Sequence, residues 1–176
     1  MKKSIFKIAI LVCAVLLSTE GIAQKFPALD KSPMDVSSFP SSYKESNKVV
    51  KVTYSRPQLK GRSLDKLAPK DKVWRTGANE AAEITFYKDV TFGDKDVKAG
   101  TYTLFTIPND KEWTLILSTA KNVWGSYFYK PEEDVVKVMG AVSKNKDSVE
   151  AFSIIFDENM NMVLGWDKTV VTVPIK

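Results

Sequence analysis

Short runs of alternating apolar and polar residues follow one another from residue 49 to the C-terminus. In the first run Val50, Val52 and Tyr54 alternate with polar residues, which is the period of a strand with one buried face. Only residues 63–67, with Ser63 as the cap, predict a helix, and it is too short for a βαβ crossover. Later runs rich in β-branched and aromatic residues predict strands at 84–87, 90–92, 101–107, 113–118, 135–142, 149–157, 160–166 and 170–175.

Turn-forming residues at close spacing between these strands predict an all-β domain, an antiparallel β-sandwich of jelly-roll-like or barrel-like form. Two hairpins are expected, one turning at residues 108–110 and the other at residues 144–147. We expect residues 48–176 to form one domain, because the roughly 150 residues after residue 23 bury enough surface for a single core. Residues 24–47 are rich in proline and serine and predict an extended leader, packed over the domain through Phe26, Met34 or Phe39.

The N-terminus has the three parts of a signal peptide. Three lysines precede an unbroken apolar run of ten residues, 8–17, and Gly21 and Ala23 supply small residues after it. Ten apolar residues are too few to span a bilayer permanently, so we expect residues 1–23 to be cleaved and Gln24 to begin the mature chain. The protein is therefore expected to be exported, to the periplasm or the exterior, with no membrane span after cleavage.

The chain after residue 23 contains neither histidine nor cysteine, because the single cysteine, Cys13, lies in the apolar run. This composition excludes Ser-His-Asp and Cys-His catalysis and the usual zinc, copper and haem sites. We therefore expect no metal and no cofactor. Cleavage removes three lysines and Glu20 and changes the net charge from +5 to +3. The remaining lysines are scattered, without a basic run interleaved with aromatics, so no nucleic-acid partner is expected.

Several stretches of the chain resemble a known family. They are YSRPQLKGR at 54–62, VWRTGANEAAEITFYKDV at 73–90, and VKAGTYTLFTIP at 97–108 followed by EWTLIL at 112–117. In this order and spacing they resemble the secreted bacterial family called domain of unknown function 2911, over residues 49–176. Lys70-Asp71 departs from the aromatic-glycine turn expected there before the tryptophan. The resemblance implies an export signal and an all-β domain, and it brings no established activity, substrate or catalytic residue.

The three arginines of the chain lie within twenty residues of one another. By contrast, the twenty lysines after residue 23 are distributed along the whole of that part of the chain. A guanidinium is a planar, bidentate donor that suits carboxylate, phosphate or sulfate and tolerates desolvation. One interpretation is therefore that the arginines converge on a pocket for an anionic ligand. The candidate ligand-binding residues of this region are Arg56, Lys60, Arg62, Trp74, Arg75, Asn79 and Glu80.

The alternative interpretation of this region is structural. Buried charges need partners, and Glu80 or Asp71 is close enough in sequence to Arg75 to form an ion pair with it. Gly77 and Asn79 are typical of a turn, because glycine adopts positive φ and asparagine bonds to its own backbone. These considerations favour an ion pair at Arg75 that holds a turn over residues 76–79.

A second candidate region is NVWGSYFYK at residues 122–130, which gathers four aromatic residues around Gly125. Exposed aromatic faces bind sugars and other flat apolar surfaces, so Trp124 and Tyr127 are candidate ligand-binding residues. The alternative is that two of the four aromatics simply fill the end of the sandwich. The sequence favours this alternative without excluding a site.

The acidic residues Glu132, Glu133 and Asp134 follow at once. Two carboxylates ~5–9 Å apart can hydrolyse glycosides, but acidic turns are usually solvated, and the alternating spacing of a calcium loop is absent. The sequence therefore favours a non-catalytic binding or scaffolding module of the bacterial envelope or exterior, for an anionic or carbohydrate ligand. The alternatives are a carboxylate-based hydrolase that works without histidine and a purely structural envelope component.

Overall fold

The computed structural model of the protein describes residues 24–176. Residues 1–23, which carry the predicted signal peptide, lie outside the described residues. The described chain is mostly strand, and the all-β prediction is confirmed. The elements are β1 (Met34–Phe39), β2 (Val50–Ser55), α2 (Leu64–Leu67), β3 (Ala82–Phe86), β4 (Val90–Phe92), β5 (Lys95–Val97), β6 (Gly100–Ile107), β7 (Glu112–Ser118), the 3-10 helix η1 (Pro131–Glu133), β8 (Asp134–Phe156) and β9 (Met162–Val173).

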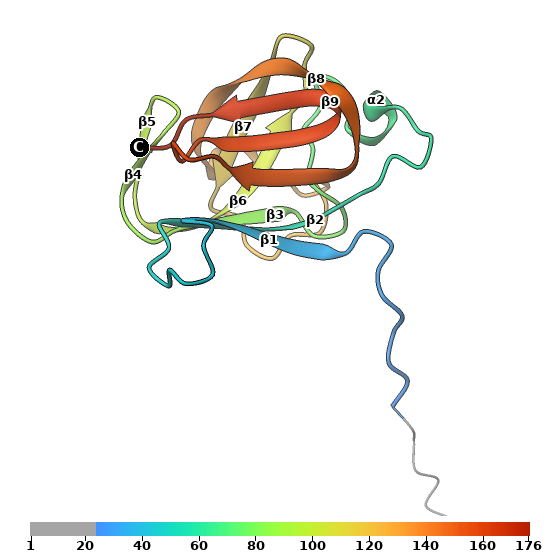
Figure 1. The fold of residues 1–176 in the computed structure, drawn as a ribbon, viewed down its shortest axis with the longest axis horizontal. Coiled ribbons are helices and arrows are strands. Elements are labelled where there is room, and N and C mark those ends of the chain that lie inside the picture. The colour runs from blue at the N-terminus through green and yellow to red at the C-terminus, as the bar shows by residue number, and fades with distance from the viewer. Residues whose placement is uncertain (1–23) are drawn as a thin grey trace, which may run out of the picture.

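Seven strands form one antiparallel sheet in the order β1-β2-β3-β6-β7-β8-β9. The sheet curls into a half-barrel, the barrel-like form of the expected fold, so β8 and β9 lie on one side of the molecule and β1, β2 and β3 on the other (Figure 1). The alternating residues Val50, Val52 and Tyr54 are at most 3% exposed, as their period predicts. β4 and β5 form a separate hairpin, which Thr91 joins to Lys176 near the C-terminus through two backbone hydrogen bonds of 2.8 and 2.9 Å.

The half-barrel encloses a cluster of four aromatic residues, each at most 5% exposed: Trp74, Trp113, Phe152 and Trp166. The rings of Trp74 and Trp166 stack with 5.5 Å between their centroids. Trp113 and Phe152 meet Trp74 edge-on, at 6.1 and 5.0 Å. Aromatic pairs in these arrangements stabilise a core beyond the burial of their area. Because the four residues come from β7, β8, β9 and the segment before β3, the cluster joins both sides of the half-barrel.

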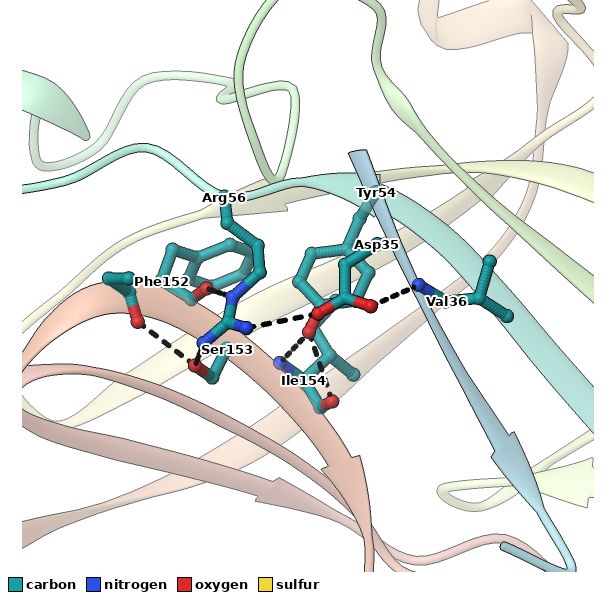
Figure 2. Close-up of polar contacts among 8 residues, drawn as sticks. Asp35, Val36, Tyr54, Arg56, Phe152, Ser153 and Ile154 are labelled. Atoms are coloured by element: carbon teal, nitrogen blue, oxygen red, sulfur yellow. Dashed lines mark hydrogen bonds and ion pairs between the residues drawn. The ribbon is translucent and has the colours of Figure 1, made fainter. Parts of the chain in front are cut away.

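Polar contacts between β2 and β8 close the curled sheet (Figure 2). Tyr54 donates its hydroxyl proton to the Ile154 carbonyl at 3.2 Å and accepts the Ile154 N–H at 2.9 Å. Arg56, just after β2, donates to the Phe152 carbonyl at 3.0 Å, to Ser153 Oγ at 2.7 Å and to Asp35 Oδ2 at 3.0 Å. Burial raises the pKa of the Tyr54 hydroxyl. We call this set of contacts the clasp.

The predicted leader contributes a strand to the sheet. β1 pairs with β2 along its whole length, and the Arg56 N–H donates to the Pro33 carbonyl at 3.0 Å. Phe39 packs against the core, whereas Phe26 and Met34 are exposed. The leader is therefore anchored through β1, at one edge of the sheet.

The predicted hairpin around residues 144–147 is wrong. Residues 134–156 form one 23-residue strand, β8, which pairs with β7 through its first part and with β9 through its second. The register of β8 with β9 shifts between Lys144 and Val149. The exposed residues 144–147, which resemble a turn, therefore lie in an irregular stretch of β8 without regular pairing. Likewise, the two strands expected at 160–166 and 170–175 are the single strand β9.

Other local predictions are confirmed. β6 and β7 form the hairpin expected around residues 108–110. α2 begins after Ser63, which occupies the N-cap position without a capping side-chain hydrogen bond. The chain reverses between β8 and β9 at Asp157, whose carboxylate accepts the side-chain and backbone N–H groups of Asn161 and the backbone N–H of Asn159. These hydrogen bonds lower the pKa of Asp157.

Candidate functional site

The structure brings together the two regions that the sequence singled out. Residues 73–81 and 122–129, which we call the paired loops, are joined by three hydrogen bonds. These run from Ala81 N to Val123 O at 3.0 Å, from Gly125 N to Asn79 O at 2.9 Å, and from Ser126 Oγ to Val73 O at 3.0 Å.

A small second core fixes the paired loops onto the sheet. Phe105 and Ile116 are directly opposite each other on β6 and β7, and their side chains point away from the main core. They form a buried cluster with Ala81, against which Val123 and Tyr129 pack. The loops therefore have a rigid support on the outer face of β6 and β7, and that support prearranges the side chains they carry.

Three residues of the paired loops have a left-handed backbone conformation, and one of them is strained. Thr76, Asn79 and Asn122 have positive φ angles of 54, 60 and 52°. Asparagine tolerates this region, but for a β-branched residue such as Thr76 it is an outlier. Thr76 is fully buried, and its hydroxyl donates to Thr106 on β6 at 3.3 Å. Strain that the surrounding structure maintains is typical of ligand sites and active sites.

Gly125 lets a guanidinium and an aromatic ring approach the same backbone position. Its φ is +67°, and a Cβ there would lie 2.7 Å from the Tyr127 ring and 3.0 Å from Arg75 Nη1. Only glycine fits both the backbone angle and the contacts. Arg75 therefore reaches across from its own loop to Gly125, which the Tyr127 ring also approaches.

The predicted ion pair at Arg75 is wrong. Among residues 24–176 the guanidinium of Arg75 has no carboxylate within ion-pair distance, and its Nε is buried without a hydrogen-bond partner. Glu80 is exposed, and its backbone pairs with that of Trp124. Asp71 is exposed and accepts a hydrogen bond from Asn109 at 2.7 Å. The positive φ angles at Thr76 and Asn79 turn the chain between Arg75 and Glu80, so Glu80 does not pair with Arg75.

Three aromatic side chains of the second loop lie open to solvent. Trp124 is 55% exposed, and Tyr127 and Phe128 are each 75% exposed. Large apolar side chains grouped on the surface commonly mark a binding site. Together with the adjacent Arg75, they form a surface with aromatic faces and one cation that no carboxylate neutralises.

The fourth aromatic residue, Tyr129, anchors the loop. Its ring packs edge-on against Phe105 at 5.3 Å, and its hydroxyl donates to Asp134. Asp134 also pairs with Lys137 at 2.9 Å and is 6% exposed. Burial, followed by the hydrogen bond to Asp134, raises the pKa of Tyr129, and the hydrogen bond to Asp134 raises the pKa of Lys137. The acidic stretch thus places one of its carboxylates in a structural network.

The remaining candidate residues lie elsewhere, and the arginines do not converge. Arg56 belongs to the clasp, and Arg62 donates to the Leu59 and Gln58 carbonyls at 2.9 and 2.7 Å, so the three arginines share no partner. Trp74 is in the core. Lys60 and Arg62 line a separate open cavity of about 490 Å³, with Lys31, Ser32 and Gln58.

A cavity that the sequence interpretation did not identify lies beside α2 and has a volume of about 260 Å³. Its walls come from α2, the β6–β7 turn and the middle of β8 and β9. No local motif could reveal it, because its lining comes from four segments that are distant in the sequence: residues 63–70, 108–113, 142–144 and 167–169. Among residues 24–176 no group of His, Cys, Asp or Glu side chains is placed to hold a metal ion. Across the same range, no helix is long and apolar enough to cross a membrane.

Comparison with known proteins gives one match. The family described as "Protein of unknown function (DUF2911)" matches residues 36–175, which include all of the curled sheet except the start of β1. No curated protein and no solved structure matches the chain significantly. Because the match spans most of the chain and both of the paired loops, the protein belongs to the DUF2911 family.

Proposed function

We propose that this protein is an exported, non-catalytic binding module that recognises an acidic glycan at the paired loops. The observation that carries this proposal is the position of Arg75, which approaches Gly125 beside the Tyr127 ring and has no carboxylate partner among residues 24–176. Trp124, Tyr127 and Phe128 are exposed on the same loop. Aromatic faces stack on the C–H faces of sugar rings, and a guanidinium binds carboxylate or sulfate.

The rigidity of the paired loops supports this assignment. The hydrogen bonds between the loops and the packing of Tyr129 fix the backbone before any ligand arrives. A site with such support loses little conformational entropy on binding, which favours affinity for a flexible ligand such as an oligosaccharide. The Nε of Arg75 is buried and has no hydrogen-bond partner among residues 24–176, so no protein acceptor competes with a ligand for it.

Export is the first part of the proposal and rests on the signal-peptide pattern of residues 1–23. Protein recovered from the envelope fraction or the medium of the producing cell should have lost these residues. Intact-mass spectrometry measures this directly. Full-length protein retained in the cytoplasm would contradict export while leaving the glycan site open to its own test.

The glycan site is tested by calorimetric titration with uronic-acid, sulfated and neutral oligosaccharides. We expect an acidic oligosaccharide to bind at least about tenfold more tightly than its neutral methyl ester, the scale of one charge-assisted contact. Trp124→Ala should weaken both ligands, because the stacking face is lost. Arg75→Gln should abolish the preference for the acidic one.

Tyr43→Ala is the matched control, because Tyr43 is 91% exposed and lies outside the paired loops. It should bind like the wild type. Absence of binding to every oligosaccharide would refute the proposal. Binding to anionic lipid vesicles that Trp124→Ala abolishes, without glycan binding, would instead assign the paired loops to a membrane surface.

A further inference from the structure

The cavity beside α2 is separate from the paired loops and has an apolar floor. Trp113 and Ala68 line it and are 3% and 1% exposed, and Leu64 contributes from α2. α2 lies at one end of the half-barrel (Figure 1). At about 260 Å³, the cavity is slightly smaller than typical ligand pockets of roughly 300–1,000 Å³, so it suits a small ligand.

Part of the charge around this cavity is already neutralised. Lys70 pairs with Asp110 at 2.7 Å and with Asp65 at 3.7 Å. The hydrogen bond to Asp110 raises the pKa of Lys70, and the same bond lowers the pKa of Asp110. One lysine balances only one of these two carboxylates, so the three residues leave a net charge of −1 at the rim.

Two further charges of the lining are not neutralised in this way. Lys144 reaches only the hydroxyl of Thr169, at a long 3.5 Å, and Asp167 accepts a hydrogen bond from Ser148 at 2.8 Å. Within residues 24–176 neither residue takes part in an ion pair, with each other or with a third group. One cavity thus presents a cation and an anion that remain apart.

The irregular pairing of β8 with β9 leaves Asp167 without a lysine directly opposite it. The register of the two strands shifts between Lys144 and Val149, and Asp167 has a φ of +50°. An uninterrupted ladder would place Lys146 directly opposite Asp167, but the irregularity places Val149 there instead. Lys144 and Asp167 both line the cavity, and no ion pair joins them.

We propose that this cavity binds a free α-amino acid as a zwitterion. The α-carboxylate would lie at Lys144, the α-ammonium at Asp167, and the side chain against Trp113. A purely anionic or purely cationic ligand would leave one of the two protein charges unmatched. This inference goes beyond the proposed glycan site and is independent of it.

The test is a heteronuclear NMR titration of the chain from residue 24 with each of the twenty standard amino acids. At least one should shift the Trp113 indole resonance and those of its neighbours. For the tightest binder, two derivatives are then compared: the N-acetyl form, which lacks the ammonium, and the amide, which lacks the carboxylate. Each should bind at least about tenfold more weakly, as expected when a charge of the site loses its partner.

Two conservative variants assign the contacts. Asp167→Asn keeps a residue that tolerates positive φ and should bind the amino acid and its N-acetyl form equally weakly. Lys144→Met keeps the apolar stem and should bind the amino acid and its amide equally weakly. Lys146→Met is the control, because Lys146 is exposed on the same strand and does not line the cavity. The proposal is overturned if no amino acid binds with a dissociation constant below about 10 mM, or if either derivative binds as well as its parent.

Discussion

Replacing Trp74 with alanine should lower the free energy of unfolding by about 3–5 kcal/mol, the usual cost of removing a large aromatic side chain from a core. Trp74 is 5% exposed and contacts the rings of Trp113, Phe152 and Trp166. Its removal would leave a cavity at the point where both sides of the half-barrel meet. Urea denaturation of the wild type and the variant measures the difference.

Trp124→Ala is the matched control, since it deletes the same side chain from the surface. Trp124 is 55% exposed, so its loss should change stability by no more than about 0.5 kcal/mol. Trp74→Phe should recover part of the loss, because a phenylalanine ring still fills much of the site. A free energy of unfolding for Trp74→Ala within about 1 kcal/mol of the wild type would contradict a core position for Trp74. It would favour instead the ligand-binding role that the sequence suggested for this residue.

Opening the clasp should have the second largest effect. Arg56→Met keeps most of the apolar stem but removes the three hydrogen bonds to Phe152, Ser153 and Asp35. We expect a loss of about 2–3 kcal/mol, chiefly because the Phe152 carbonyl and the Ser153 hydroxyl lose a charged donor. The ion pair itself contributes little, since its side chains are 35% and 44% exposed.

A double-mutant cycle separates these contributions. Asp35→Asn alone should cost less than about 1 kcal/mol, and its coupling to Arg56 should be of similar size. Arg62→Met is the matched arginine control, because Arg62 bonds only to carbonyls within its own loop. If Arg56→Met and Arg62→Met lower the free energy of unfolding equally, the clasp adds no stability of its own.

The sequence predicts the strands well where burial alternates along a short segment. The pattern of Val50, Val52 and Tyr54 depends only on which face of the strand meets the core, and neighbouring residues reveal this directly. The residues at 144–147 mislead because lysine, asparagine and aspartate favour both tight turns and exposed bulges. Only the partners of β8, which are distant in sequence, distinguish the two cases.

The candidate site, too, is predicted from the sequence only in part. Its aromatic and arginine components are visible in the sequence as composition, but their juxtaposition arises because residues 73–81 and 122–129 pack on one face of β6 and β7. The ion pair expected at Arg75 fails for a local reason. Glu80 is only five positions from Arg75 in the sequence, but the left-handed residues Thr76 and Asn79 lie between the two. They turn the chain, and the Glu80 side chain is exposed.

The clasp also determines the order in which the molecule can form. Tyr54 and Ile154 are 100 positions apart in the chain, so the half-barrel closes only after nearly all of it is available. Contacts of such long sequence separation slow folding, because the loop between them must be ordered before they are made. During synthesis from the N-terminus, β1, β2 and β3 exist for a long interval without β8 to cover them. The half-barrel should therefore close slowly and late, and its exposed strands are most prone to aggregate in the interval before it closes.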